Sequence, residues 1–329
     1  MTHLAVAIII VMKISQLIAT LLTPVSAWTS LSMMGSRAAT KGSNREVWAE
    51  ARGFSALGST GGGDGDDSSP SVPFATIIGG GRIGSMLAEN GECLLVKREG
   101  AIAADGTGPI FIATRNDSLE GIIDACPENR RKDLMFLQNG YLDGFLDSKG
   151  LADNSQCLLF VAVTAIGADP IDGITTVNPE GLTGATGEHA AALQARLNAA
   201  GMKCNILTAE TYKPAMFEKL MWISTYMLVG AAKECSSVGQ AGGEHGDLVE
   251  QVINELVNAV TAKEGVTFPD GTVERLKAYT DVVASFPCAV KEFEWRNKYF
   301  YDLGDDACPV HNGLLRECAE KGLLSFELP

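Results

Sequence analysis

The sequence predicts an α/β protein in which a parallel-sheet domain over residues 72–210 is followed by an all-helical domain over residues 211–329. Three observations support this prediction. Short apolar runs of β type alternate with helical segments between residues 75 and 210, an order typical of a parallel sheet with right-handed crossovers. A glycine-rich turn follows the first of these runs. Beyond residue 211 the apolar residues recur at helical spacing, as at Val249, Val252, Ile253 and Leu256.

The segment before the predicted domains has the features of a targeting sequence. Residues 1–27 are mainly apolar, contain one lysine (Lys13), and end in VSA, small residues of the kind that a signal peptidase requires. We expect a signal peptide here, and one that begins at Met12 rather than Met1 fits the pattern better. An uncleaved membrane anchor is the alternative, although Lys13 interrupts the apolar run.

Residues 28–71 continue the targeting sequence and then connect it to the predicted domains. They begin with Trp28 and carry three basic residues before the first acidic residue of the chain, Glu46. An acid-free segment rich in serine and arginine is typical of a transit peptide, and together the two parts resemble the bipartite presequences of proteins imported into secondary plastids. We therefore expect a plastid location, with a secreted or endomembrane location as the alternative. Residues 52–71 are mostly Gly, Ser and Asp and predict a flexible linker.

The glycine-rich turn predicts a dinucleotide site. Residues 79–84 read GGGRIG and match G-x-G-x-x-G between a β-type run at 75–78 and a short helical stretch, the context that a Rossmann-type domain requires. In this pattern Gly79 makes the tight turn, Gly81 lets the backbone approach a pyrophosphate, and Gly84 lets the helix pack closely on the strand. Arg82 and Ile83 lie inside the motif and are counted with it as cofactor-binding residues.

The residues after the second β-type run, 93–96, indicate which dinucleotide is bound. An acidic residue there would hydrogen-bond the ribose 2′-hydroxyl of NAD. This chain has Lys97 and Arg98 instead, and two cations suit the 2′-phosphate of NADP, although Glu99 follows them. NADP is therefore the predicted cofactor, and a solvated strand end is the alternative interpretation of the two basic residues.

Polar residues follow the next two β-type runs. Thr114, Arg115 and Asn116 come after the run at 110–113, and Asn139 comes after the run at 134–137, in the sequence QNG. Because ligands of parallel sheets bind beyond the carboxyl ends of the strands, we expect the first three residues to contact the cofactor and Asn139 to lie in the active site. Plain turn chemistry is the alternative for an Asn-Gly pair.

The first long helix of the second domain, expected from Pro214 onward, contains an isolated charge. In KLMWISTYMLVG, residues 219–230, Lys219 precedes eleven residues that carry no charge. A buried lysine costs several kcal/mol unless it is paired or neutralised. It is therefore either a functional amine or a snorkelling side chain whose amine reaches water. Trp222 in the same helix is expected in the core.

The composition excludes some classes of function. A formal net charge of −14 and a pI near 4.8 argue against a nucleic-acid partner, and we expect no membrane partner for the mature protein. The chain has eight cysteines but no C-x-x-C pair, and four histidines, so no zinc-ligand spacing is present and no metal is predicted. The cysteines lie mostly in apolar runs, which favours buried thiols in a reducing compartment.

From about residue 75 to residue 325 the chain resembles the ketopantoate reductase (2-dehydropantoate 2-reductase) family of the 6-phosphogluconate dehydrogenase-like superfamily. The resemblance rests on GGGRIG, LVKR, QNG, EKLMWIS and FPCAVKEFEWRN, and it is nearer to a plant and algal branch of that family. It implies that Asn139 matches the active-site asparagine of an HNG or QNG turn, and that Lys219 matches the catalytic lysine that opens a K-x-x-x-N-x-x-x-N helix.

The chain also departs from that family's pattern. Ile223 and Met227 stand where the motif has its two asparagines, Ser285 fits a family serine, and Asn297 falls at or near the position of a family glutamate, with Glu294 close but out of register. These four positions, Ile223, Met227, Ser285 and Asn297, are the substrate-binding residues that the resemblance implies. The substrate face is then more apolar, so ketopantoate itself is not the expected substrate.

The resemblance implies an enzyme, an NADP-dependent reductase or dehydrogenase acting on a CH–OH/C=O group of a small 2-oxo acid or related compound. Lys219 would polarise the carbonyl oxygen and give it a proton, while Asn139 would orient the substrate. Because the helical domain often mediates dimers in this superfamily, a homodimer is also implied. The alternative is a catalytically weak NADP(H)-binding redox sensor or interaction protein, for which the glycine motif would serve equally well.

Overall fold

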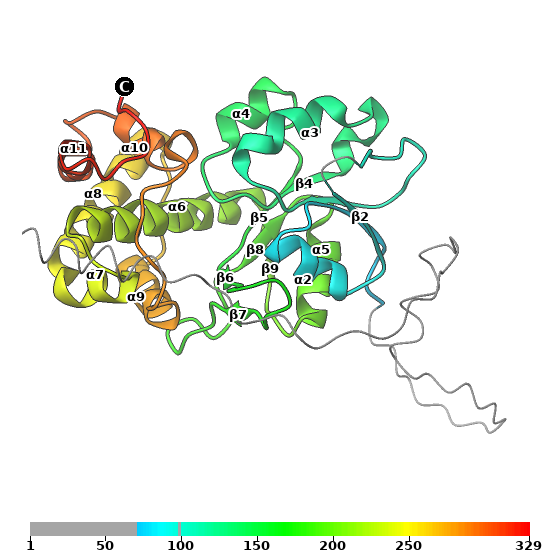
Figure 1. Cartoon of the computed structure of the whole chain (residues 1–329), viewed down its shortest axis with the longest axis horizontal. Helices are drawn as coiled ribbons and strands as arrows, with labels where there is room; N and C mark the ends of the chain where they lie inside the picture. The colour runs from blue at the N-terminus through cyan, green and yellow to red at the C-terminus, as the bar shows by residue number, and fades with distance from the viewer. Residues whose placement is uncertain (1–70, 98–99) are drawn as a thin grey trace, which may run out of the picture. The chain divides into compact units, whose positions relative to one another are not determined.

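The computed structural model describes residues 71–97 and 100–329, which belong to one compact unit of the chain (Figure 1). The predicted signal peptide, the transit-like segment, the linker up to residue 70 and Arg98 lie outside the described residues. In the described ranges, no helix combines the length and the apolar composition that crossing a membrane requires.

Within these ranges seven strands form one sheet in the order β2-β1-β3-β4-β5-β8-β9. All neighbouring strands are parallel except β5 and β8, which are antiparallel. This confirms the predicted mostly parallel α/β domain. The strands are β1 (Ala75–Ile78), β2 (Cys93–Val96), β3 (Ile110–Ile112), β4 (Leu134–Phe136), β5 (Ser155–Leu158), β8 (Gly184–Thr186) and β9 (Asn205–Ile206), with a separate hairpin of β6 (Val161–Ala162) and β7 (Ile171–Asp172).

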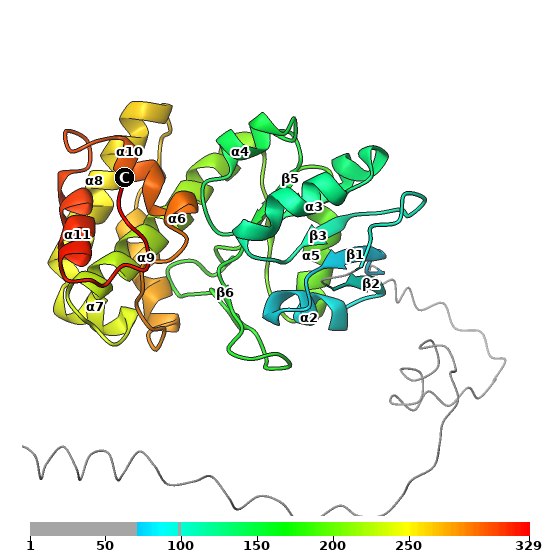
Figure 2. The same ribbon diagram turned by 45° about the horizontal axis from the view of Figure 1, so that its top comes forward.

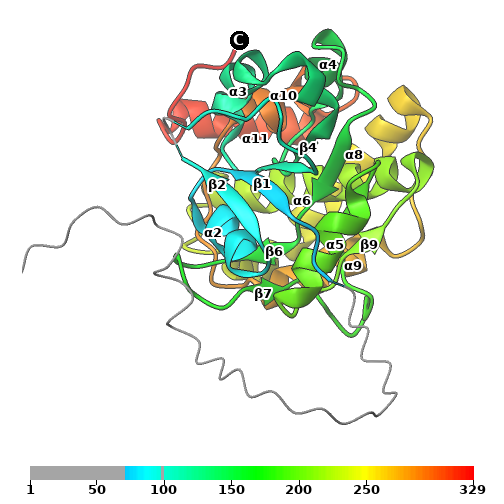
Figure 3. The ribbon, with the colours of Figure 1, turned by 90° about the vertical axis from the view of Figure 1, so that its right-hand side faces the viewer.

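The central strands are apolar on both faces because helices cover both sides of the sheet, as Figure 3 shows. One face packs on α2 (Arg82–Glu89) and α5 (Ala190–Ala199), and the other on α3 (Leu119–Ala125) and α4 (Asp143–Ser148). Side chains alternate between the two cores, so Ile77 lies in the first and Ile78 in the second. Two 3₁₀ turns, Asn116–Ser118 and Glu128–Asp133, complete the connections.

A buried arginine holds the segments that lead into β1 and β2 at the amino ends of these strands. Arg196 on α5 is fully buried and donates to three backbone carbonyls, those of Leu87, Pro73 and Glu92, at 2.8–2.9 Å. These three hydrogen bonds offset part of the cost of burying the guanidinium. The helix α5 is thereby tied to the unit that carries the predicted cofactor motif.

The residues from 209 onward are helical, which confirms the second domain's class. Its elements are α6 (Ala209–Ala232), α7 (Val238–Glu244), α8 (Gly246–Glu264), α9 (Thr272–Val282), a 3₁₀ turn at Phe293–Trp295, α10 (Asn297–Asp302) and α11 (Pro309–Glu320). Gly265 ends α8 with φ +66°, a backbone angle that glycine adopts easily. The expectation that the first helix starts at Pro214 is wrong: Thr208 caps α6 by accepting from Thr211 N, and Pro214 lies inside the helix.

The long helix α6 is buried nearly all round because it is shared between the two regions. It packs on α7, α8 and α11 and also contacts β5 and β8 of the sheet (Figures 1 and 2). A helix that is covered on every side needs apolar residues on every side, which explains the uncharged run behind Lys219. All eight cysteines lie in the described ranges as free thiols, six of them buried.

Candidate active site

The three motif glycines meet three different steric demands at the end of β1. Gly79 has φ +106°, and a Cβ there would lie 2.8 Å from the carbonyl oxygen of Ala113. A Cβ on Gly84 would overlap the carbonyl oxygen of Gly79, so α2 can approach β1 only without a side chain at that position. A Cβ on Gly81 would meet no atom within 4 Å. The side chain missing at Gly81 therefore leaves room for a ligand rather than for the protein itself.

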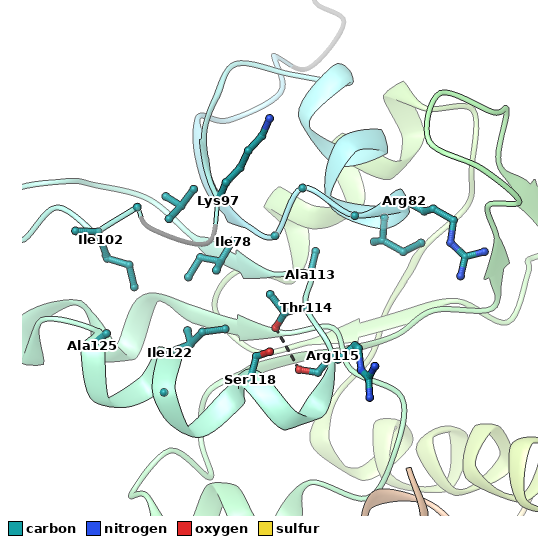
Figure 4. A pocket seen from close by; sticks show the side chains of 18 residues that line it. Ile78, Arg82, Lys97, Ile102, Ala113, Thr114, Arg115, Ser118, Ile122 and Ala125 are labelled. Carbon is teal, nitrogen blue, oxygen red and sulfur yellow. Dashed lines mark hydrogen bonds between the residues drawn. The ribbon is translucent and has the colours of Figure 1, made fainter. Parts of the chain in front are cut away.

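The open side of this turn faces a cavity of about 1090 Å³ (Figure 4). Gly81 is the N-cap residue of α2, and no acidic side chain stands in the first turn of that helix, so its free N–H groups can receive an anion. Arg82 donates to Val163 O at 2.9 Å and flanks the turn. Seven of the ten residues predicted to bind the cofactor line the cavity: Gly79, Gly81, Arg82, Ile83, Lys97, Thr114 and Arg115.

The far end of the cavity combines one cation with an apolar wall. The exposed Lys97 passes over the turn, since a Cβ on Gly80 would lie 3.3 Å from its Cε. Ile102, Ile122 and Ala125 form the opposite wall, a surface suited to a flat ring. Arg115 is exposed and pairs with Asp117 at 3.1 Å, and the Thr114 hydroxyl donates to Arg115 O at 3.3 Å (Figure 4).

Asn116 does not line this cavity. It is 3% exposed, and its Nδ2 donates to Asn139 O at 2.9 Å and to Glu292 Oε1 at 3.3 Å. Its Oδ1 is buried and accepts no hydrogen bond from the described residues. Asn116 therefore connects the strand end that borders the cofactor cavity with the turn that carries Asn139. Gly84, a buried residue of α2, does not line the cavity either and lets that helix pack on β1.

Asn139 and Lys219, the two residues predicted to be catalytic, line one narrow cavity at the carboxyl end of β4. Its volume is about 10 Å³, close to the space of a single water molecule. Gly140, with φ +139°, brings this turn against the backbone of Trp295: a Cβ there would lie 2.5 Å from Trp295 O, and Tyr141 N donates to the same oxygen at 2.7 Å. The remaining lining includes Gln138, Cys157 and Tyr212.

The amine of Lys219 stays inside the protein and does not snorkel to water. The residue is 6% exposed, and its Nζ lies 4.1 Å from the ring centroid of Phe160, 5.0 Å from that of Tyr279 and 5.1 Å from that of Trp222. No carboxylate of the described residues pairs with it. Burial and, to a smaller extent, the nearby Arg296 guanidinium together lower the pKa of Lys219 to about 7, while Cys157 opposes the shift.

Sequence reasoning missed most of these neighbours. Trp222 is a core residue as expected, with Nε1 donating to Thr280 Oγ1 at 2.8 Å, but its ring also faces Lys219. Its position three residues after the lysine, on the same helical face, was a usable signal. Phe160 follows β5 and Tyr279 lies on α9, so no local pattern connects them with Lys219.

The four residues expected to bind substrate lie outside the cavity of Asn139 and Lys219. Ile223 and Met227 follow Lys219 by one and two turns and pack in the core of the helical region. Ser285 is exposed in the turn after α9. Asn297 is 2% exposed, and its Oδ1 lies 3.0 Å from Nε2 of His311, so its side chain is engaged in the helical core.

The polar turn from Glu292 to Arg296 lies beside Asn139. Glu292 has φ +52°, rare for a residue with a side chain, and forms an ion pair with Arg296 four residues on. The Arg296 side chain is 16% exposed, and its Nε is buried without a hydrogen-bond partner in the described part of the chain. In the same ranges no three His, Cys, Asp or Glu side chains are grouped as metal ligands would be.

The geometry can be compared with known proteins. No family model matches the chain, and no curated protein matches it in sequence. Solved structures do match. A ketopantoate reductase from Ralstonia eutropha JMP134 has a TM-score of 0.55 and 17% identity, covering 76% of this chain and 98% of that one.

Two further structures agree with it. A 2-dehydropantoate 2-reductase from Methylococcus capsulatus has a TM-score of 0.54 and 18% identity over 78% of this chain and 99% of that one. A D-mandelate dehydrogenase, solved with NADH and anilino(oxo)acetate, has a TM-score of 0.56 and 14% identity over 76% and 98%. The chain thus has the ketopantoate reductase-like fold, a Rossmann-type sheet domain followed by a helical domain.

Proposed function

We propose that this chain is an NADP-dependent oxidoreductase that transfers hydride from NADPH to the carbonyl of a small 2-oxo acid or a related compound. One observation carries the proposal: Asn139 and the buried Lys219 line the same cavity. Asn116 connects the Asn139 turn with the strand end that borders the large cavity at the glycine-rich turn. The turn that carries Asn139 is therefore joined by one hydrogen bond to the residue that follows the strand end at the large cavity, and Lys219 shares the small cavity with Asn139.

The residues around the large cavity fit a dinucleotide. The empty space at Gly81 would admit the pyrophosphate, the N-terminus of α2 and Arg82 would bind its charge, and Lys97 would face the adenosine ribose. The bound cofactor would supply the hydride. Lys97 and Arg98 in place of an acid support NADP over NAD, and the mandelate dehydrogenase structure, which contains NADH, supports a nicotinamide cofactor in general.

The chain's own part in the reaction is proton transfer and orientation. An amine with a pKa near 7 carries a proton in a substantial fraction of molecules at neutral pH and releases it readily, which suits a general acid toward a developing alkoxide. Phe160, Trp222 and Tyr279 exclude water around that amine. The backbone carbonyl of Asn139 accepts a hydrogen bond from Asn116, which fixes the turn. The side-chain amide of Asn139 would then bind the substrate.

The substrate proposed is not ketopantoate. Ile223 and Met227 lie in the apolar core, at positions where the reductase motif has asparagines. The side chain of Asn297 is hydrogen-bonded to His311. A site built to hydrogen-bond a polar substrate loses much of its discrimination when these partners are absent. The cavity of about 10 Å³ also means that α6 and the Asn139 turn must separate slightly before any substrate enters.

The same small cavity supports one alternative, a catalytically weak NADP(H)-binding redox sensor or interaction protein. To decide between the two, NADPH and NADH are titrated by fluorescence, and NADPH oxidation is followed with a panel of 2-oxo acids that includes ketopantoate. We expect binding of NADPH in preference to NADH and turnover with a 2-oxo acid other than ketopantoate. Tight NADPH binding without any turnover would favour the alternative.

The variant that tests the role of Lys219 is Lys219→Met, and its matched control is Lys213→Met, which removes a partly exposed lysine of the same helix that pairs with Glu264. We expect a loss of about 10² to 10⁴ in kcat for the first, the usual contribution of a general acid, and little change for the second. Turnover that survives Lys219→Met would remove the lysine from the mechanism. Lys97→Glu should shift the preference from NADPH toward NADH.

Two further proposals concern the setting of the protein. We propose a plastid location on the basis of the presequence, with secretion as the alternative, and a fluorescent fusion of the full chain tests it. We also propose a homodimer, supported by the report of a dimer for the Staphylococcus aureus ketopantoate reductase, whose structure has a TM-score of 0.51 with this chain. Light scattering of the purified protein would show a mass near 35 kDa if it is a monomer.

A further inference from the structure

The turn that carries Arg296 is fixed to the turn that carries Asn139. Trp295 O accepts a hydrogen bond from Tyr141 N at 2.7 Å, and Gly140 has no side chain that would separate the two backbones. The ring of Trp295 also meets Phe145 edge-on, with centroids 5.1 Å apart. Arg296 is the next residue, so its guanidinium has a defined position relative to Asn139 even though the two lie far apart in sequence.

Glu292 holds Arg296 from the other end of the same turn. The two side chains form an ion pair, and Asn116 Nδ2 donates to the carboxylate of Glu292 at 3.3 Å. Glu292 has φ +52° and ψ +50°, a left-handed conformation that is strained for a residue with a Cβ. Strained residues of this kind gather at functional sites, where the surrounding contacts maintain them.

Arg296 retains hydrogen-bonding capacity after this pairing. A guanidinium has five N–H donors, and in Arg296 the Nη2 group donates to Glu292 Oε2. The Nε group is buried and donates to no described residue, and the buried Oδ1 of Asn116 beside Glu292 is likewise without a donor. Buried polar groups rarely stay without partners, so the free Nε donor of Arg296 indicates an acceptor that the described residues do not supply. A carboxylate matches the guanidinium fork best.

The charges near Lys219 favour an anion in the same place. Arg296 is close enough to lower the pKa of Lys219, and after burial it is the largest cause of that shift. The titratable groups around the amine in the described part of the chain also include the Cys157 thiol on β5, Tyr212 on α6 and the ring of Tyr279 on α9. With Lys219 protonated, Glu292 is the one carboxylate among the described residues that pairs with either cation, which leaves one positive charge for a monoanionic ligand.

We propose that Arg296 binds the carboxylate of the substrate, so that the adjacent 2-oxo group faces Lys219. The proposal rests on the proposed reductase function and names the group that selects a 2-oxo acid over a neutral ketone. It also couples binding to protonation. A carboxylate placed between the two cations favours the charged amine, so substrate arrival would draw a proton onto Lys219 and prepare it as the donor.

The test measures binding rather than turnover, so that its failure is separate from a failure of the proposed function. The probes are oxamate, a 2-oxo acid isostere that is not reduced, and oxamide, its neutral analogue, titrated by calorimetry into the NADP-saturated protein. We expect oxamate to bind at least about 10-fold more tightly than oxamide. Arg296→Gln should abolish that preference, because a hydrogen bond to a charged group is worth roughly a 10- to 100-fold difference in affinity.

Two variants keep the result interpretable. Arg296→Lys retains the charge and the partner for Glu292 but loses the planar fork, and should weaken oxamate binding to an intermediate extent. Arg275→Gln removes a similarly buried arginine paired with Glu218, outside the site, and should leave oxamate binding unchanged. Circular dichroism checks that each variant is folded.

Proton uptake is the readout that a purely structural arginine would not change. Calorimetry of oxamate binding at pH 8 in two buffers of different ionisation enthalpy should show net uptake of up to one proton in the native protein and none in Lys219→Met. The proposal is overturned if folded Arg296→Gln binds oxamate like the native protein, or if the native protein does not distinguish oxamate from oxamide. If either result is found and the protein still oxidises NADPH with 2-oxo acids, the reductase function is retained and only the role of Arg296 is excluded.

Discussion

The ammonium nitrogen of Lys219 lies 4.1 Å from the centroid of the Phe160 ring. The contact joins the middle of α6 to the segment that follows β5, and Tyr279 and Trp222 complete the surroundings of the amine. Cation–π attraction of about 2 kcal/mol for a desolvated contact offsets part of the cost of burying the charge. It does not offset all of it, because burial still lowers the pKa of Lys219 to about 7.

The lowered pKa of Lys219 predicts a pH-dependent effect on stability. In the unfolded chain a lysine has a pKa near 10.4, so between pH 7 and that value the unfolded state binds more protons than the folded state. Stability therefore rises with pH in this window, by up to about 1.4 kcal/mol per pH unit, and the burial penalty is fully present below pH 7. Lys219→Met should raise the free energy of unfolding at pH 6.5 by more than at pH 9.5.

Urea denaturation of both proteins at these two pH values measures the effect. Lys213→Met, which removes a partly exposed lysine of the same helix, serves as the control and should show a small difference that hardly varies with pH. A Lys219→Met variant that changes stability by the same amount at both pH values would mean that the amine is charged in the folded protein throughout.

Alanine substitutions at two of the motif glycines should have different effects, one on stability and one on cofactor binding. Gly84→Ala places a Cβ on the carbonyl oxygen of Gly79, so α2 must shift, and we expect a loss of stability of about 3 kcal/mol or more. Gly81→Ala meets no protein atom within 4 Å and should fold normally. Because its methyl group would occupy the space of the pyrophosphate, NADPH affinity should fall by at least about 10-fold. Thermal melting and fluorescence titration of both variants separate the two effects, and normal cofactor binding by Gly81→Ala would contradict the assignment.

Gly140 is expected to be indispensable for the contact between the Asn139 turn and Trp295. Its φ is +139°, and a Cβ at this position would lie 2.5 Å from Trp295 O, so Gly140→Ala must push the two backbones apart. We expect a destabilisation of about 2 kcal/mol or more and a loss of oxamate binding, since Arg296 follows Trp295. Gly144→Ala in α4, where a Cβ would meet nothing within 4 Å, is the control and should be neutral or slightly stabilising. Equal effects of the two substitutions would contradict the argument.

His311 predicts an acid-sensitive helical core. Burial lowers its pKa to about 4, and Nε2 and Nδ1 lie within 3.0 Å of the amides of Asn297 and Asn312. Because the unfolded histidine takes up a proton near pH 6.5 and the folded one only near pH 4, stability is lost as the pH falls through this window, by about 3 kcal/mol in total. His311→Gln should reduce the drop in melting temperature between pH 7 and pH 4.5, and an undiminished drop would assign the acid sensitivity to other groups.

Local patterns in the sequence were enough to predict the fold and to propose part of the candidate site. The alternation of apolar runs, the spacing of Gly79, Gly81 and Gly84, and the helical spacing beyond residue 211 each depend on a few consecutive residues, and the structure has the mostly parallel sheet and the helical region that they predict. The placement of Asn139 and Lys219 around one cavity also follows the family motifs. The plant and algal branch, the presequence and NADP rather than NAD stay predictions.

Contacts between segments remote in the chain were decided only by the tertiary structure. Phe160 and Tyr279 surround Lys219 from 59 and 60 residues away, and Glu292 reaches Asn116 across 176 residues, so no periodicity links them. The same folding leaves Ser285 exposed and pairs Asn297 with His311, although both stand at positions that the family motif assigns to substrate.

The sequence by itself thus determined which elements form and which lysine carries an uncompensated charge. The tertiary structure decided what that charge meets: three aromatic rings and a second cation instead of a carboxylate. The physical reason is that the spacing of neighbouring residues controls secondary structure, whereas the pKa of a buried group depends on every side chain within a few ångströms, whatever its place in the chain.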